Sequence, residues 1–385
     1  MASPDNLLDR AVQPFLRACR AWVSSVTSPR SRRTACVAAE CSSQNLALAE
    51  LIRSLLPPAV ARALPYETAK ARLPPIAARF PAADRIVAIG DVHGDVDALR
   101  TALRSARVLD ENDRWSGGDT VLVQVGDVLD RGNHERAIYR LLFSLQDSAP
   151  LSGGAVHILL GNHEVMNARL DFRYVTRAGF DEFRGARPRM QFAPSLVHAI
   201  RSLPPFKRPR AVALSPGGSL AAQLALRARL AVIVGDNVFV HAGLRKDHLT
   251  DGVHSRKGPD HALNMLNERT STFLMGMGSL PTALRGGRSP IWMRDYSRPP
   301  VLDPGSDVCS MLADTLKFLR AKRMIVGHTP QLQGINSVCT GQVWRIDTGM
   351  SAVYGGVPEA FEINRNGKVQ IHTPDGAIDG CKRFH

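Results

Sequence analysis

The chain has 385 residues, of which 44% are hydrophobic and 22% charged, values typical of a folded protein and not of a disordered or collagen-like chain. Charged residues interrupt every apolar stretch before it reaches the roughly 20 residues that a membrane-spanning helix needs, so no membrane span is expected. The net charge of +14 is dispersed and indicates a solvated basic surface or attraction of anionic substrates. A nucleic-acid partner is not expected, because aromatic residues that stack on bases make up only 6%.

Residues 1 to about 80 predict an extension ahead of the folded domain, partly disordered or helical. They are rich in Ala, Arg, Ser and Pro and lack a sustained strand period. Apolar side chains between Leu7 and Leu16 recur at helical spacing, which predicts a short amphipathic helix. This helix either packs on the domain or belongs to an organelle-targeting segment, although Asp5 and Asp9 weigh against targeting because transit peptides are poor in acidic residues.

Three strand-loop-helix units are predicted from Arg85 onward, because three short apolar runs each end at a glycine and helical patterns follow. These runs are 86–89, 121–125 and 156–160. Later strands are predicted to be mostly hairpin-connected. Gly235-Asp236-Asn237 is a turn signal between two of them. The later runs are 231–234, 238–240, 322–326 and 343–346.

This order of elements predicts an α/β fold, a mixed sheet system flanked by helices. Two long stretches, 165–230 and 245–288, are Arg-rich and poor in strand signals. We expect both to form helical insertions over the functional site.

The six cysteines suggest no disulfide framework. They are Cys19, Cys36, Cys41, Cys309, Cys339 and Cys381. None forms a CxxC pair, so reduced thiols in an intracellular compartment are expected, either cytoplasmic or organellar (plastid or mitochondrion). A redox role for Cys309 and Cys339, which lie on either side of one candidate metal ligand, is the alternative.

Polar side chains of the kinds that bind metals follow most of the predicted strands, in glycine-containing loops. In chain order they are Asp91 with His93, Asp127, Asn162 with His163, His241, and His328. Loops at the carboxyl ends of strands in such sheets converge on one crevice, so residues far apart in sequence can share a site.

The donor set combines hard oxygen with imidazole, which suits Mn, Fe or Zn better than a thiolate site or an all-oxygen calcium cage does. A dinuclear centre is expected, because two metals about 3.5 to 4 Å apart and bridged by a carboxylate generate hydroxide at neutral pH and clamp phosphate oxygens. Each motif alone is a weak signal, since an Asp after a strand is usually a turn residue.

Five motifs in one fixed order carry a family resemblance. They are Gly90-Asp91-Val92-His93-Gly94-Asp95, Gly126-Asp127-Val128-Leu129-Asp130-Arg131-Gly132, Gly161-Asn162-His163-Glu164, His241-Ala242-Gly243 and Gly327-His328-Thr329. Their order resembles the phosphoprotein phosphatase family of metallophosphoesterases. The stretches 115–132, 161–167 with 171–175, and 291–296 more closely resemble the Shewanella-like protein phosphatases, and the resemblance covers roughly residues 84 to 365.

The resemblance implies the metallophosphoesterase fold, with two mixed β-sheets packed as a central sandwich flanked by helices. The domain is expected at 81–375 and a C-terminal tail at 376–385. It also implies two metal ions, Mn or Fe with Zn as an alternative. The implied ligands are Asp91 and His93 for one ion, Asn162, His241 and His328 for the other, and Asp127 bridging both.

Further roles follow from chemistry and motif position. Arg131 and Arg294 fit as bidentate partners of the charge that spreads over a phosphoryl group in transfer. His163, held by Asp130, fits as the general acid for the departing oxygen.

Two departures from the family pattern spare every proposed ligand: Ala242 replaces a usual Gly, and Leu170 lies where a Gly is usual and can alter what enters the cleft. Asp95 and Glu164 are expected to support loop hydrogen bonds. The other histidines are interpreted as surface or packing residues. They are His134, His157, His198, His248, His254, His261, His372 and His385.

The leading hypothesis is a metal-dependent phosphoprotein phosphatase. It would hydrolyse phosphoserine, phosphothreonine or phosphotyrosine monoesters in a protein or peptide by attack of a bimetal-bound hydroxide. A second hypothesis is hydrolysis of dinucleoside polyphosphates or another small phosphoester. A third is a basic binding protein with a vestigial site, which is disfavoured because no ligand is missing. Nuclease activity is suggested only by the net charge.

Overall fold

The computed structural model describes residues 77–188, 192–250, 257–298 and 303–380. The chain divides into two units, Met1–Pro75 and Ile76–His385, and every element described below belongs to the second. The expected N-terminal helix and the alternative targeting segment lie outside the described residues.

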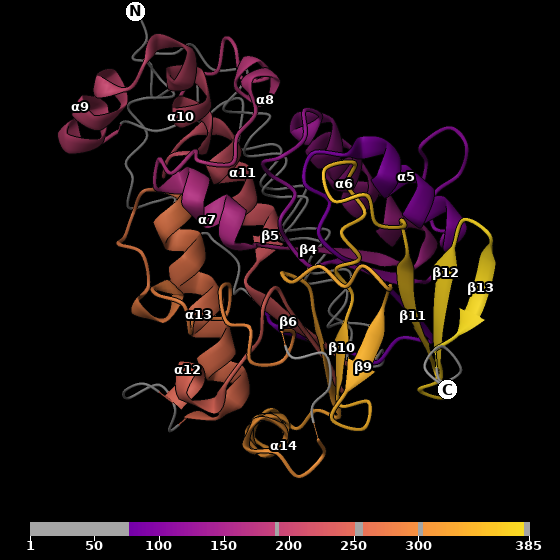
Figure 1. Ribbon diagram of the computed structural model, residues 1–385. Helices are drawn as coiled ribbons and strands as arrows, with labels where there is room; N and C mark the ends of the chain where they lie inside the picture. Colours follow the sequence, from indigo (N-terminus) through magenta and orange to yellow (C-terminus); the bar gives the residue numbers. More distant parts are fainter. Residues whose placement is uncertain (1–76, 189–191, 251–256, 299–302, 381–385) are drawn as a thin grey trace, which may run out of the picture. The chain divides into compact units, whose positions relative to one another are not determined.

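The larger sheet has seven strands in the order β13-β12-β11-β2-β3-β4-β5 (Figure 1). They span Arg85–Ile89 (β2), Val121–Gln124 (β3), Ala155–Leu159 (β4), Ala228–Arg229 (β5), Ala360–Asn364 (β11), Val369–Thr373 (β12) and Gly376–Asp379 (β13). Strands β2 to β5 run parallel, whereas β11 pairs antiparallel with β2 and continues into an antiparallel meander. The parallel strands β2 and β3 are covered on both faces, which explains their continuous apolar sequences.

The second sheet has six strands in the order β1-β6-β7-β8-β10-β9. They span Arg79–Phe80 (β1), Ala231–Val234 (β6), Asn237–Val240 (β7), Arg323–Val326 (β8), Asn336–Val338 (β9) and Val343–Arg345 (β10). The predicted hairpin is confirmed, since β6 and β7 are antiparallel and Val234 pairs with Asn237. Gly235 in its turn has a φ of 60°, which glycine adopts without a steric cost.

The two sheets pack face to face through one apolar layer. Buried side chains from the larger sheet, among them Val123 and Phe361, join side chains from the smaller sheet, among them Phe239 and Ile325, in a single hydrophobic cluster. Removal of this area from water is the main favourable contribution to folding. The expected α/β sandwich of two mixed sheets is therefore confirmed.

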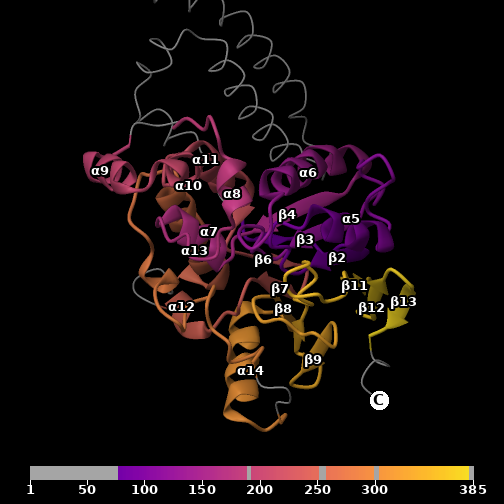
Figure 2. The same ribbon diagram turned by 45° about the horizontal axis from the view of Figure 1, so that its top comes forward.

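Helices cover the outer faces of the sandwich (Figure 2). α5 (Val96–Ser105) contacts β2, β11 and β12, and α6 (Glu135–Ser148) contacts β4. On the smaller sheet, α14 (Asp307–Leu319) buries Leu312 and Leu316 in one cluster with Met324 of β8. None of the helices in the described ranges has the length and apolar character needed to cross a membrane.

The first stretch expected to form a helical insertion, 165–230, holds several helices and ends with strand β5. Its helices are the end of α7 (Asn162–Ala168), α8 (Arg177–Asp181), α9 (Pro194–Ser202), α10 (Arg208–Leu214) and α11 (Ser219–Arg227). A small separate cluster around Phe172, Phe180 and Ile200 holds part of it together. The second stretch contains α12 (Lys246–Thr250) and α13 (Pro259–Leu274), and α13 packs on α11.

The sheets extend past the boundaries that the sequence suggested. β1 at 79–80 pairs with β6, and β13 at 376–379 pairs with β12, so both lie outside the expected 81–375. Six strands were not predicted: β1, β5, β9, β11, β12 and β13. β1 and β5 have two residues each, too few for a measurable periodicity.

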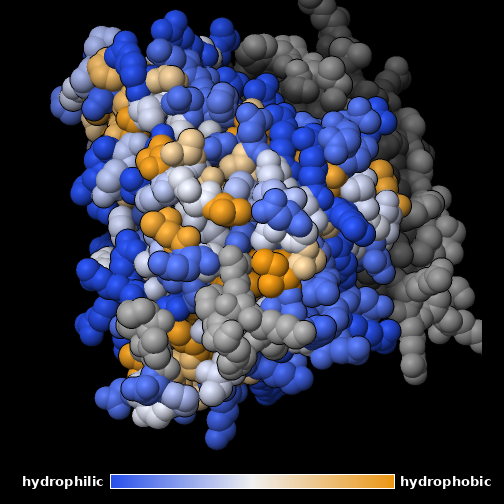
Figure 3. All heavy atoms as spheres, turned by 45° about the vertical axis from the view of Figure 1, so that its right-hand side comes forward, coloured by the Kyte–Doolittle hydropathy of each residue, from blue (hydrophilic) through white to orange (hydrophobic). Residues whose placement is uncertain are grey.

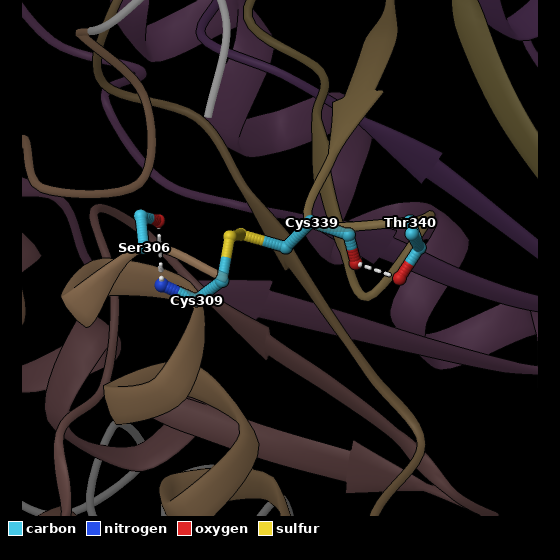
Figure 4. The surroundings of a disulfide bond; sticks show 4 residues. All are labelled: Ser306, Cys309, Cys339 and Thr340. Carbon is cyan, nitrogen blue, oxygen red and sulfur yellow. Dashed lines mark hydrogen bonds between the residues drawn. A yellow bond between two sulfur atoms is a disulfide. The ribbon is translucent and has the colours of Figure 1, made fainter. Parts of the chain in front are cut away.

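Cys309 and Cys339 are joined by a disulfide that connects the first turn of α14 to the residue after β9 (Figure 4). Both cysteines are buried. The expectation of reduced thiols is therefore wrong for this pair, because a sequence separation of 30 residues gives no spacing signal. The other four cysteines lie outside the described residues.

We expect the double variant Cys309→Ala, Cys339→Ala to be less stable than the native chain. A disulfide that closes a loop of this separation, 30 residues, restricts the unfolded chain and contributes about 3 to 4 kcal/mol. Urea unfolding without reductant should show that loss of unfolding free energy. With reductant the native chain and the variant should unfold alike. Equal stabilities without reductant would contradict the bond.

Candidate active site

Loops from both sheets meet at one end of the sandwich and bring the six predicted ligands into one buried cluster. Three strands of the larger sheet and two of the smaller sheet lead into these loops. Each of the six side chains is at most 6% exposed; they are Asp91, His93, Asp127, Asn162, His241 and His328.

Asp127 lies at the centre of this cluster. Its Oδ2 is 3.9 Å from Nε2 of His93 on one side and 3.3 Å from Nε2 of His241 on the other. Two groups of side chains are spaced closely enough to hold an ion, His93-Asp127-His163 and Asp127-His241-His328. Asp127 is the residue that they share.

Four polar atoms converge on the His241 side of the cluster. Nδ1 of His241 lies 3.0 Å from the Val125 carbonyl, so its Nε2 faces the cluster. Around that Nε2 lie Oδ1 of Asn162 at 3.0 Å, Nδ1 of His328 at 3.2 Å and Oδ2 of Asp127 at 3.3 Å. His328 Nε2 faces the Trp292 carbonyl at 3.2 Å, so its Nδ1 presents a lone pair. Imidazole nitrogen, amide oxygen and carboxylate oxygen are atom types that bind a shared cation.

The ionisation of three members of the cluster suits metal binding. Burial lowers the pKa of His93 to about 4 and that of His328 to about 2, so both imidazoles are neutral donors. Burial acts to raise the pKa of Asp127, but its interactions with His241 and His163 outweigh burial and hold that pKa well below its ordinary value. Neutral imidazole and ionised carboxylate are the forms that bind metal ions.

Asp91 lies beside a carboxylate that the sequence reading missed, Asp347. Both Asp91 oxygens are 3.1 Å from the backbone N–H of His328. Burial, followed by the charges of Asp347 and Asp127, raises the pKa of Asp91. Asp347 follows β10 closely, as the predicted ligands follow their strands, so the same strand-end rule points to it.

Several residues of the site have left-handed backbone conformations, which cost about 1 to 3 kcal/mol each outside glycine. Their φ angles run from 47° to 70° and belong to His93, Asp127, Asp130, Arg131 and His328. Such conformations persist only where neighbouring contacts hold them in place.

Glu164 provides much of that support. Its two carboxylate oxygens accept the backbone N–H groups of Gly161 at 2.7 Å, Asp127 at 3.0 Å and Val128 at 3.0 Å. A side chain at Gly161 is excluded, since its Cβ would lie 2.1 Å from Oδ1 of Asp127. Asp95 likewise supports loops, because it caps α5 and accepts the N–H of Ala352 at 2.9 Å.

His163 and Asp130 form a hydrogen-bonded pair at the edge of the cluster. Nδ1 of His163 is 2.6 Å from Oδ2 of Asp130, and its Nε2 is 3.7 Å from Oδ2 of Asp127. The other oxygen of Asp130 is held by Arg210 and Asn167, neither of which the sequence reading singled out.

The two predicted arginines lie beside the cluster. The guanidinium of Arg131 sits between two aromatic rings, 4.5 Å from the centre of Tyr174 and 5.1 Å from that of Tyr354. Its Nε is buried and has no hydrogen-bond partner among the described residues. Arg294 donates to Oγ1 of Thr329 at 2.9 Å, next to His328.

Exposed apolar side chains occur in the loops that carry Tyr354 and Leu332. Val353 and Val357 are 58% and 49% exposed, and Leu332 is 60% exposed. A Cβ on Gly349 would contact both Leu332 and Tyr354, so these loops lie side by side. The face shown in Figure 3 likewise has small hydrophobic patches between hydrophilic residues.

Leu170 does not belong to this group of exposed apolar side chains. It packs against the cluster around Phe172, so the structure gives it a role within the insertion. Its φ of 65° explains why glycine is usual at this position.

Other histidines make packing contacts of the expected kind. His157 stacks on Phe80 with ring centres 4.1 Å apart, and His372 pairs with Glu362 at 2.8 Å. His254 and His385 lie outside the described residues.

Comparisons with known proteins agree with the site. A sequence model of the calcineurin-like phosphoesterases matches residues 84–332. Shewanella-like protein phosphatase 2 of Arabidopsis thaliana is 36% identical over 325 residues, which cover 77% of this chain and 79% of the relative. Shewanella-like protein phosphatase 1 of Plasmodium berghei is 30% identical over 69% of this chain and 67% of that relative.

Solved structures give the same fold. The cold-active protein-tyrosine phosphatase of a psychrophile Shewanella species has a TM-score of 0.60 at 21% sequence identity, over 79% of this chain and 82% of that one. The strand-end donors, their motif order and these relatives lead to one conclusion. The chain belongs to the calcineurin-like phosphoesterases and, within them, to the Shewanella-like protein phosphatases.

Proposed function

We propose that the chain hydrolyses phosphate monoesters on phosphorylated proteins or peptides in a metal-dependent reaction. The observation that carries this proposal is the buried convergence of metal-binding side chains around Asp127, flanked by Arg131 and by the His163-Asp130 pair. Membership in the family implies a dinuclear metal centre. The family relationship also makes the chain a phosphoesterase, that is, a hydrolase.

The donor atoms suit two ions that share one carboxylate. Asp91 and His93 would hold one ion, and Asp127 would bridge to the second. The ligands of the second ion would be Asn162, His241 and His328. Mixed oxygen and imidazole donors favour Mn or Fe, with Zn as the alternative. When bound, the metal pair supplies an activated water and compensates charge on phosphate oxygens.

Two arginines would orient the phosphoryl group. Arg131 is restrained by Tyr174 and Tyr354, so little side-chain entropy is lost when its guanidinium donates hydrogen bonds to phosphate oxygens. Arg294, which donates to the His328 carbonyl at 3.3 Å, would contribute a second positive group. Preorganised positive charge of this kind stabilises the charge that develops during phosphoryl transfer.

His163 would donate a proton from Nε2 to the departing oxygen. The carboxylate of Asp130 holds Nδ1 at 2.6 Å and stabilises the protonated ring. The same Nε2 also lies within the group formed with His93 and Asp127, so His163 as a metal ligand is the rival assignment.

A peptide substrate is favoured over a small phosphoester by the relatives of this chain. The relatives named above are protein phosphatases by name. A vestigial binding function is disfavoured because the complete donor set is present and buried.

The proposal is tested by assaying the purified chain with added Mn. Phosphate release from phosphoserine, phosphothreonine and phosphotyrosine peptides is compared with hydrolysis of a dinucleoside polyphosphate. We expect peptide hydrolysis that a chelator abolishes and that Mn restores. Hydrolysis of the dinucleotide alone would support the small-phosphoester alternative, and metal binding without any hydrolysis would support a vestigial site.

Asp127→Asn and Arg131→Ala should separate metal binding from phosphate binding. Removing the shared carboxylate charge should sharply reduce the metal content and lower turnover by about a hundredfold or more. Arg131→Ala should retain the metals and lower turnover by about 10² to 10³. Elemental analysis of both variants provides the check. Full metal content in Asp127→Asn, or loss of metal in Arg131→Ala, would refute the assignment.

His163→Asn should show a leaving-group effect. Without a general acid, we expect a loss of about a hundredfold or more with a phosphoserine peptide, whose alkoxide needs a proton, and a much smaller loss with p-nitrophenyl phosphate. His157→Asn, a histidine packed on Phe80, is the matched control and should keep the wild-type ratio of the two rates. Equal losses on both substrates, or loss of metal from His163→Asn, would favour the rival assignment.

A further inference from the structure

We propose that Arg210 is a positioning residue for the reaction, and that it acts by fixing Asp130 so that His163 can donate its proton. This inference rests on the proposed function. Arg210 lies on α10 and its side chain is fully buried. It does not touch the ligand cluster, so its effect on the chemistry would pass through Asp130.

The two oxygens of Asp130 have separate partners. Oδ2 faces Nδ1 of His163 at 2.6 Å. Oδ1 accepts Nη2–H of Arg210 at 2.9 Å and Nδ2–H of Asn167 at 2.8 Å. Because Oδ1 is held from two directions, the carboxylate cannot rotate without breaking both hydrogen bonds. Oδ2 is thereby kept for His163.

Arg210 also organises the groups that surround Asp130. Its Nε donates to Oδ1 of Asn167 at 2.7 Å, which orients the amide that in turn holds Asp130. Its two Nη atoms form a bidentate pair with Glu135, and Glu135 accepts the backbone N–H of Asp130. Arg210 therefore restrains the side chain of Asp130 directly and its backbone through Glu135.

That backbone restraint has a visible consequence. Asp130 has a φ of 70°, a conformation that a non-glycine residue keeps only when its contacts enforce it. The hydrogen bond from its N–H to Glu135 is one such contact. Without Arg210, two buried carboxylates, Asp130 and Glu135, would face each other with no cation between them.

Stability alone is a poor explanation for this network. Burying charged groups carries a desolvation penalty, and well-packed apolar residues often stabilise a core as well or better. What a planar guanidinium provides and an apolar side chain lacks is directional control of three neighbours, Asp130, Glu135 and Asn167. The need for that control is explained if Asp130 must present one oxygen to His163.

The experiment compares three variants in the metal-loaded chain. Arg210→Met keeps similar bulk and removes the charge. Arg210→Lys keeps the positive charge but lacks the planar guanidinium and its paired N–H donors. The double variant Arg210→Met, Glu135→Gln removes one of the two buried carboxylates that would lose their cation, in case Arg210→Met fails to fold. Each is assayed with a phosphoserine peptide and with p-nitrophenyl phosphate, alongside metal content and thermal stability.

We expect Arg210→Met and the double variant to retain the metals and to lose at least about tenfold more kcat with the phosphoserine peptide than with p-nitrophenyl phosphate. Arg210→Lys should show a smaller difference between the two losses than Arg210→Met does. In an Asp130→Asn background, Arg210→Met should change the gap by no more than about twofold, because residues that act through one another are not additive. Arg229→Met, on β5 and outside this network, should leave the gap unchanged.

Equal losses on both substrates would overturn the inference, since a merely structural arginine lowers both rates alike. The inference would also be overturned if Arg210→Met in the Asp130→Asn background widened the gap between the two substrates by as much as it does in the wild-type chain. These failures are distinguishable from a failure of the proposed function, in which the wild-type chain hydrolyses no phosphopeptide. If His163→Asn itself shows no leaving-group effect, the general acid is absent and the role of Arg210 falls with it.

Discussion

The structure of the site depends on one electrostatic constraint, the burial of the ionised Asp127 carboxylate among other metal-binding side chains. His241 and His328 each turn a ring nitrogen toward this region because their other ring nitrogens face backbone carbonyls. Burial of a charged group costs free energy unless a positive charge compensates it. The metal centre that the family implies is therefore built into the packing of the loops.

The sandwich explains how these side chains meet. The larger sheet supplies Asp127 and Asn162 at the ends of parallel strands, and the smaller sheet supplies His241 and His328. Since the two sheets share one apolar layer, their loops are held at a fixed separation. Glu164 then secures the left-handed turn at Asp127 from within the larger sheet's loops. The strand order therefore determines both the apolar layer between the sheets and the positions of the predicted metal ligands.

The ligands were predictable from sequence because each follows a short apolar run and sits in a distinctive motif. Arg210 was not, since it lies in a stretch where arginines are frequent and nothing local distinguishes the one that is buried. The disulfide was missed because its cysteines are 30 residues apart and are brought together only by the packing of α14. Tyr174, from the insertion, meets Arg131 only through tertiary structure. Local sequence patterns identify residues whose role is set within one loop. Residues that meet only in the tertiary structure cannot be identified in this way.

The cluster must also keep one histidine distinct from its neighbours. His93 has Nδ1 against the neutral Leu129 carbonyl at 3.0 Å, and burial lowers its pKa to about 4, so it is a neutral ring with a free Nε2 lone pair. His163 has Nδ1 against the Asp130 carboxylate, and a negative partner stabilises the protonated ring instead. These two neighbouring histidines therefore have different chemistry within one buried site. Arg210 matters in this scheme because it decides which oxygen of Asp130 His163 meets.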